Sequence, residues 1–453
     1  MKKLVALLLT AIMLLSVSAL AEAPEGYPEV VPGIDFEGKT VSIYVWYDSK
    51  RAEEPTEEEQ ARYDFEDWIM ETYNVKVEYV NHYDWAGGIA NLIDFVGNPD
   101  PSVLCLYTLP GDFVGTALRN DLFAPLDDVL DVNDDKWNAI TREFMTKNGK
   151  VYGMLAGDTE PREGIFFNHR ILRDAGIDPE SIYDLQANNE WTFEKFTELL
   201  AATQKDVDND GVIDIWGITG SRDDLVFAAI ASNNGELFGK DENGKMSVKA
   251  DSANTIEALN WVADVYANYF YKGEPDENGS VAWDYYKEAW KQGISAFRVG
   301  QHWEAFNDVS EMDGMEDEWG FVAVPLGPKG DTYVNLANDN TVGIPAIYDQ
   351  ETLKKIAFIY DLWMEPTPGY EDDEFAWIGN KYNKTPDDRA IDETLTMLRQ
   401  PEHIRVNNQL ALGDKNELLG NSLLWQIGWG TTPAELVEAA MPAWQAVVDE
   451  YNK

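Results

Sequence analysis

The stretch 206–214, with the sequence DVDNDGVID, has the residue types and spacing of a calcium-binding loop. Alternate carboxylates can converge on one cation, while a glycine at the sixth position, here Gly211, permits the sharp turn. The expected ligands are the side chains of Asp206, Asp208, Asp210 and Asp214 and the carbonyl oxygen of Val212. The twelfth position is Gly217, where a regulatory calcium loop has a bidentate glutamate. The sequence thus predicts a structural Ca2+ ion, and a metal-free acidic turn is the alternative.

Aromatic side chains are the second chemical signal, since the chain holds 16 tryptophans and 21 tyrosines. Most of them belong to the core, because large aromatic side chains dominate core burial. A flat ring can also cover the apolar C–H face of a sugar, while carboxylates, amides and arginines bond its hydroxyl rim. An aromatic residue that follows a strand, next to polar residues, is therefore a candidate ligand contact.

Strands that alternate with helices must position these residues. The stretches 40–47, 75–80 and 102–108 are rich in β-branched and aromatic residues and predict strands, and a capping box at 56–59 predicts a helix between the first two. In open α/β sheets the ligand lies outside the carboxyl ends of the strands. This rule selects Tyr47, Asp48 and Tyr107. Trp303 and Glu304 stand similarly just after a predicted strand at 294–300.

The rest of the chain is also predicted to alternate between helices and strands. Apolar residues at helical spacing predict helices at 251–268, 283–292 and 350–364, and Thr432 with Glu435 predicts the start of the last helix. The stretch 319–330 predicts a strand that runs into a Pro/Gly-rich turn. No internal repeat of 20–50 residues is evident.

Composition excludes several classes of protein. With 453 residues, of which 44% are hydrophobic, the chain can bury a large core and form two or more domains. A net charge of −47 argues against nucleic acids and anionic membrane surfaces as partners. The single cysteine, Cys105, lies in an apolar run and is expected to be a buried thiol.

The first residues predict export. Lys2 and Lys3 precede an apolar run at 4–15, and small residues near 19–23 fit a cleavage site, so 1–23 is expected to be a signal peptide. The mature protein is then expected in the periplasm or at the cell surface. No cysteine follows the signal for lipid attachment.

Catalytic motifs were not found. The histidines, His82, His169, His302 and His403, form no metal-ligand motif, and the expectation for His169 is a place on a helix surface. The sequence has no G-x-S-x-G, Walker or dinucleotide fingerprint. With 82 acidic residues, no glycosidase carboxylate pair can be nominated by spacing. The sequence therefore nominates no catalytic centre, and we do not expect an enzyme.

Four stretches carry a resemblance to a known family. NGKVYGM at 148–154, GIFFN at 164–168, EWTFEKFTELL at 190–200 and the acidic loop occur in an order that resembles the extracellular solute-binding proteins of bacterial sugar ABC importers, the maltose-binding-protein-like group. Several sugar-binding relatives are similar in having the acidic loop without the final glutamate. The resemblance implies stacking positions at Tyr107, Trp303 and Trp425, ligand-facing polar residues at Arg222, Asp223 and Asp224, and further contacts at Arg162, Asn338 and Asp339.

Together these observations predict a two-lobed α/β periplasmic-binding-protein-like fold of type II, joined by a hinge. The expected N-terminal lobe is 24–157 plus 328–378, and the C-terminal lobe is 158–327 plus 379–453. A monomer would capture a sugar in the cleft by hinge closure and deliver it to an ABC permease, as the resemblance implies. The alternatives are a secreted glycoside hydrolase or lyase and a glycan-binding surface protein without a transport role.

Overall fold

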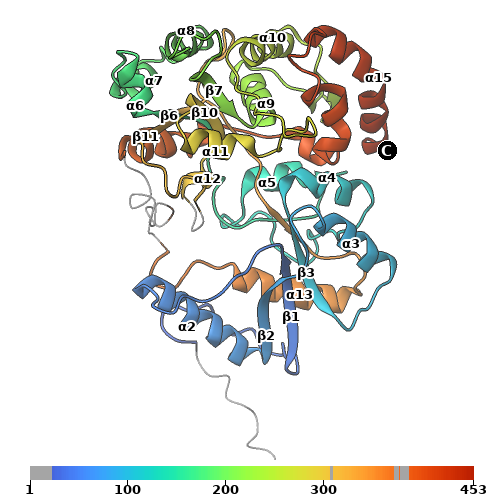
Figure 1. Cartoon of the computed structure of the whole chain (residues 1–453). Helices are drawn as coiled ribbons and strands as arrows, with labels where there is room; N and C mark the ends of the chain where they lie inside the picture. Colours follow the sequence, from blue (N-terminus) through green and yellow to red (C-terminus); the bar gives the residue numbers. More distant parts are fainter. Residues whose placement is uncertain (1–22, 307–309, 372–376, 378–386) are drawn as a thin grey trace, which may run out of the picture.

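Two α/β lobes, each built on a four-stranded sheet, make up the molecule (Figure 1). The computed structural model describes residues 23–306, 310–371, 377 and 387–453. The predicted signal peptide lies outside these residues apart from its last position. Within the described residues, no helix is both long and apolar enough to cross a membrane.

The sheet of the first lobe has the order β13-β3-β1-β2. Its strands are β1 (Lys39–Val45), β2 (Val75–Asn81), β3 (Leu104–Leu109) and β13 (Thr341–Gly343), and its main helices are α2 (Glu57–Thr72), α3 (Gly88–Gly97) and α13 (Gln350–Trp363). β1 is parallel to both of its neighbours, whereas β13 is antiparallel to β3. The predicted capping box of α2 is confirmed, because Thr56 and Glu59 each bond the other's backbone N–H.

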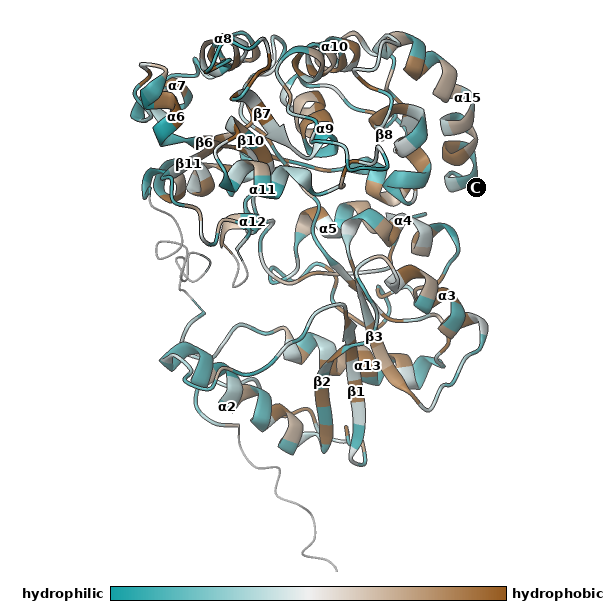
Figure 2. Cartoon of the chain, in the orientation of Figure 1, coloured by the Kyte–Doolittle hydropathy of each residue, from teal (hydrophilic) through white to brown (hydrophobic). Residues whose placement is uncertain are grey.

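Helix α2 has one narrow buried face, and its other faces are mostly polar. The helix is mostly hydrophilic in Figure 2, and only Phe65 and Ile69 are buried on it. These two side chains join a core cluster with Val41 of β1 and Ile356 of α13. A narrow apolar face is therefore enough to hold α2 on the sheet.

The sheet of the second lobe is mixed, with the order β11-β6-β10-β7. The strands are β6 (Glu163–Asn168), β7 (Trp216–Gly220), β10 (Ser295–Gln301) and β11 (Trp319–Ala323). β6 is antiparallel to β10 and β11, and β10 is parallel to β7. The helices are α6 (His169–Asp174), α7 (Glu180–Ala187), α8 (Phe193–Thr203), α9 (Arg222–Ser232), α10 (Ala253–Asn268), α11 (Tyr285–Lys291), α12 (Trp303–Phe306) and α15 (Pro433–Tyr451).

The chain passes between the two sheets three times. The first passage joins β5 (Lys150–Val151) to β6, the second joins β11 to β13, and the third joins α13 to a π-helix, η2 (Ala390–Leu395). Each lobe is therefore discontinuous, and the predicted two-lobed fold is confirmed. The predicted boundaries at 157 and 327 fall in the first two passages, and the boundary at 378 lies outside the described residues.

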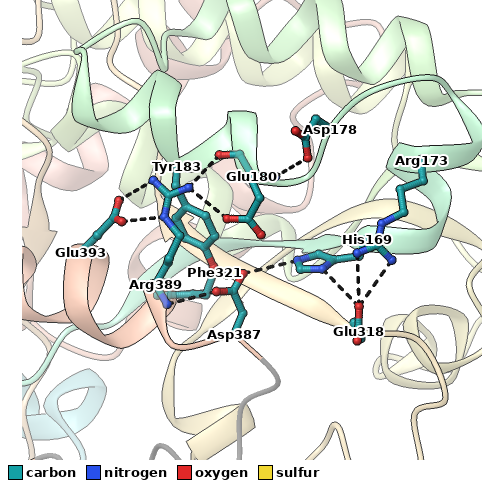
Figure 3. Close-up of polar contacts among 10 residues, drawn as sticks. All are labelled: His169, Arg173, Asp178, Glu180, Tyr183, Glu318, Phe321, Asp387, Arg389 and Glu393. Atoms are coloured by element: carbon teal, nitrogen blue, oxygen red, sulfur yellow. Dashed lines mark hydrogen bonds and ion pairs between the residues drawn. The ribbon is translucent and has the colours of Figure 1, made fainter.

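A cluster of polar side chains fixes the third passage where it enters the second lobe (Figure 3). Arg389 binds Glu180, Asp184 and Glu393 at 2.6–3.0 Å. The imidazole of His169 lies 3.5 Å from Asp387 and stacks on Phe167. Contrary to expectation, His169 is buried.

Asp387 is the acidic partner of this imidazole. Burial alone would raise the pKa of Asp387, but hydrogen bonds from His169 and Tyr183 hold that pKa below its usual value. The carboxylate therefore stays ionised, and it secures the end of the third passage against α6 and α7.

Arg298, on the central strand β10, is fully buried and neutralises two acids. One terminal nitrogen of its guanidinium lies 2.6 Å from Glu304 and 2.6 Å from Glu311. The ring of Tyr286 lies 5.1 Å from the guanidinium carbon. A buried arginine of this kind compensates charges that would be costly to bury alone.

Replacing Arg298 by methionine should lower the free energy of unfolding by about 3–5 kcal/mol, because it leaves Glu304 buried without its cation. Urea denaturation measures the change. The matched control is Arg173→Met, whose ion pair with Glu318 is exposed and should contribute at most about 1 kcal/mol. Equal losses in the two variants would contradict a charge-balancing role for Arg298.

Candidate ligand-binding site between the lobes

A cavity of about 620 Å3 lies where the three passages come together. Its size is within the range of small-molecule binding pockets. It is lined by Leu155, Ala156, Gly157, Asp158, Glu160, Arg162, His302, Trp303, Asp339, Asn340, Trp377 and Arg399. The structure thus brings together Arg162, Trp303 and Asp339 among the residues predicted from sequence. We call this cavity the cleft.

Trp303 presents an aromatic face to the cleft. β10 ends at Gln301, and α12 begins at Trp303, so the indole stands just beyond the carboxyl end of the central strand. The side chain remains 39% exposed, although its ring N–H is fixed by donating to Gln301 Oε1 at 2.7 Å. The ring is therefore held in one orientation, and part of its surface remains accessible to a ligand.

Gln301 connects several cleft residues. Its carbonyl oxygen accepts from Trp303 and, at 3.4 Å, from Arg162. Its amide nitrogen donates to Asp224 at 3.2 Å. Arg162 in turn donates to the backbone carbonyl of Asn338 in the second passage. The side-chain amide of Gln301 therefore connects β10 to the first passage and to α9.

Arg399 and Trp377 form the opposite part of the lining. The guanidinium carbon of Arg399 lies 4.4 Å from the centre of the Trp377 ring, and the same side chain binds Glu160 and Asp158. Asp158 and Glu160 belong to the first passage. Arg399 therefore ties the chain after the third passage to the chain of the first.

An ion pair crosses from the first lobe to the second beside the cleft. Asp112 is in α4 (Gly111–Arg119), which follows β3, and its carboxylate lies 3.2 Å from the ammonium of Lys415. Burial by itself would lower the pKa of Lys415, but the carboxylates of Asp112, Asp224 and Asp223 outweigh it and raise that pKa above its usual value. One lysine therefore holds acids from both lobes together.

Glu163, the first residue of β6, adds a further buried acid. Burial, and after it the negative charge of Asp224, raises the pKa of Glu163 well above the usual value. One of its oxygens is buried and has no hydrogen-bond partner among the described residues. The wall of the site next to Asp224 is therefore desolvated, and Glu163 keeps its proton at neutral pH because its pKa is about 8.

The first turn of α9 supplies the other predicted polar residues. Asp223 is close enough to Lys415 for the two charges to interact, although burial raises the pKa of Asp223. The guanidinium carbon of Arg222 lies 4.8 Å from the centre of the Tyr266 ring. Trp429 packs edge-on against Tyr266 and is 62% exposed. An aromatic and cationic surface thus extends from α9 toward the C-terminal segment.

Several other predicted residues lie outside the lining of the cleft. Tyr107 is fully buried, and its hydroxyl donates to Asn91. Glu304 is buried against Arg298. Tyr47 and Trp425 are 43% and 41% exposed, and Asp48 accepts a hydrogen bond from Asn81. In this conformation Tyr107 and Glu304 have no surface to offer a ligand.

Sequence reasoning missed four residues that hold the site together: Asp112, Glu163, Gln301 and Lys415. Gln301 is the last residue of β10, and Asp112 lies in the first turn of the helix that follows β3, so the rule that selected Tyr107 could have found both. Lys415 had no local signal, because its partners come from distant parts of the chain.

The acidic loop has the donor chemistry of a calcium site. Carboxylate oxygens of Asp206, Asp208 and Asp210 all lie within 4.8 Å of one another. Gly211 has a φ of +94°, which a residue with a side chain would seldom adopt. The carboxylate of Asp214 accepts the backbone N–H of Val207 at 2.6 Å. Oxygen ligands clustered in this way fit a hard cation such as Ca2+.

Comparison with known proteins adds three findings. Residues 52–357 match the family described as bacterial extracellular solute-binding protein, and no curated protein matches the chain. The fold is similar to the GacH receptor of Streptomyces glaucescens (16% identity, 91% of this chain and 99% of that one covered, TM-score 0.58). It is also similar to MalE of Listeria monocytogenes (15% identity, 92% of this chain and 100% of that one covered, TM-score 0.60). A third similar structure is UgpB of Mycobacterium tuberculosis (14% identity, 86% of this chain and 95% of that one covered, TM-score 0.60).

The family match extends from the chain before α2 into α13, which is more than half of the chain and includes both lobes. The solved structures share the fold over nearly their whole length. The chain belongs to the bacterial extracellular solute-binding protein family.

Proposed function

We propose that the protein is the exported binding component of an ABC importer, and that it captures a sugar or oligosaccharide in the cleft between its lobes. The observation that carries the proposal is the exposed face of Trp303, set among polar side chains where all three passages meet. Ring faces and hydroxyl-bonding groups side by side are what a sugar requires. Similar structures hold acarbose, cycloalternan and maltose.

The charges around the cleft favour a neutral ligand. The lining contains the carboxylates of Asp158, Glu160 and Asp339, and Asp224 lies behind Gln301. Both arginines of the lining are already engaged, Arg399 by carboxylates and Arg162 by a carbonyl oxygen. A phosphodiester such as the glycerophosphocholine held by UgpB would meet an acidic wall. Hydroxyl groups can use the same carboxylates as acceptors.

Hinge closure supplies the mechanism. A ligand that contacts both lobes stabilises the closed form by the difference between its affinities for the closed and open forms. Lys415 with Asp112, and Lys240 with Glu143 at 3.3 Å, join elements of the two lobes. A monomer closed in this way would present a defined surface to a membrane permease, with no catalytic step.

Replacing Trp303 by alanine should weaken saccharide binding more than tenfold, because it removes the stacking face and the hydrogen bond to Gln301. Titration calorimetry with the best ligand from a saccharide thermal-shift screen measures the change. The matched control is Trp283→Ala, whose indole is 77% exposed and outside the lining, and which should leave the affinity unchanged.

Unchanged affinity in Trp303→Ala would remove this residue from the site. Release of shorter products from an oligosaccharide during the same incubation would favour a secreted hydrolase or lyase. Binding without products is the expected result.

We also propose that the loop 206–214 binds one Ca2+ ion, held by Asp206, Asp208, Asp210, Asp214 and the carbonyl oxygen of Val212. The carboxylates of the first three aspartates repel one another at the distances they have, and a cation between them would offset that repulsion. When bound, the ion would brace the chain between α8 and β7, and it would take no part in chemistry.

Chelation with EDTA should lower the melting temperature, and added Ca2+ should restore it, because an ion that binds only the folded state stabilises that state. The Asp208→Asn/Asp210→Asn variant should melt at the lower temperature with or without chelator. Asp276→Asn, in another exposed turn, is the control and should keep the response. No response to EDTA and no metal by elemental analysis would leave the loop as a surface turn.

A further inference from the structure

A second cavity, of about 640 Å3, lies in the second lobe beside α9, and the second passage contributes Asp331 and Leu336 to it. It is located at the carboxyl end of α9, the opposite end of that helix from Arg222 and Asp224, and we call it the lobe cavity. Its lining is Phe227, Ile230, Ala231, Asn234, Gly235, Glu236, Leu237, Phe238, Lys249, Ser252, Asn254, Asp331, Leu336, Arg405, Val406, Asn407, Asn408 and Gln409. None of these residues lines the cleft.

Three consecutive amides on one side of the lobe cavity have no hydrogen-bond partner for their side chains among the residues that the structure describes. They are Asn407, Asn408 and Gln409, at the start of η4 (Asn408–Ala411). Asn407 and Gln409 are 7% and 8% exposed, and both line the lobe cavity. The side-chain oxygen of Asn408 is buried without a hydrogen-bond partner in the described part of the chain, and such an acceptor is costly. Together with the neighbouring amides of Asn407 and Gln409, it can bond a ligand that supplies both donors and acceptors.

The other amides of the lining are occupied, which gives the cavity a fixed wall. Asn234 donates to the carbonyl of Lys329 at 2.8 Å, and Asn254 donates to the carbonyl of Asn234 at 3.1 Å. Among the amides of the lining, those without a side-chain partner in the described residues are therefore at 407–409.

Charge and apolar surface restrict the class of ligand. Lys249 and Arg405 are balanced by Glu236 and Asp331, and Arg405 lies 3.6 Å from Asp331. Phe227, Ile230 and Leu237 add apolar surface to the same cavity. A neutral molecule with hydroxyl groups and an apolar face matches this combination, whereas an anion or a cation would disturb the balance.

We propose that the lobe cavity is a second site that binds a neutral polyhydroxylated molecule of the size of a mono- or disaccharide. The hydroxyl groups of the ligand exchange hydrogen bonds with Asn407, Asn408 and Gln409, and its C–H face lies on the apolar wall. The site is separate from the cleft, so it does not depend on the function proposed for the cleft.

Hydrogen–deuterium exchange by mass spectrometry tests the site, with D-glucose, maltose and sorbitol as probes. At least one probe should slow exchange about threefold or more in peptides that cover 234–238 and 405–411. The protection should persist in Trp303→Ala, in which the cleft is weakened. It should disappear in Asn407→Leu/Gln409→Leu, whose cleft affinity should be unchanged.

The leucine variant should fold, because the side-chain amides that it replaces make no hydrogen bond within the described part of the chain and leucine is similar to them in size. Its melting temperature checks this, and the single variant Gln409→Leu serves if the double variant is unstable. Protection that survives the leucine substitutions, protection that vanishes in Trp303→Ala, or no protection by any of the three probes would overturn the proposal.

Discussion

The contact between the two lobes depends on charge balance at a small number of buried polar contacts beside a shared apolar core. Lys415 is the centre of this balance, since its ammonium pairs with Asp112 of α4 while Asp223 and Asp224 of α9 lie nearby. Without that cation, acids from two lobes would face one another in a desolvated place. Val114 and Leu118 of α4 belong to the same apolar core cluster as Leu410, so this ion pair lies at a packed junction.

Close backbone packing reinforces the same junction. A side chain at Gly115 of α4 would come within 2.2 Å of the backbone nitrogen of Gly413. The helix can therefore approach the C-terminal segment this closely only because residue 115 is a glycine. This approach places Asp112 beside Lys415. The close backbone approach and the ion pair, at 3.2 Å, therefore lie side by side at this junction. The cleft then receives groups from both lobes, as capture of a ligand requires.

Local sequence signals predicted the parts of the fold that are decided locally. The helix starts at Thr56 and Thr432 were correct because a capping box is a contact between residues three positions apart. The strand β10 and the place of Trp303 after it followed from composition and order. β13 spans only Thr341–Gly343, too few residues for a pattern, and its place beside β3 is a tertiary effect.

The site was less predictable because its contacts are distant in sequence. Arg162 and Asn338 are 176 positions apart, and no local property of either residue predicts that the two are in contact. Glu304 and Asp224 have the same local appearance, an acid in the first turn of a helix, yet Glu304 is bound by Arg298 and Asp224 by Gln301. Only the tertiary arrangement separates an acid that belongs to the core from one that stands behind the cleft.

Closure of the lobes on a bound saccharide is the central claim, and small-angle X-ray scattering measures it most directly. The radius of gyration should fall when a saccharide that binds by calorimetry is added, and Trp303→Ala should need a higher saccharide concentration for the same fall. Scattering curves that stay superimposable while calorimetry shows the cleft to be saturated would contradict the account.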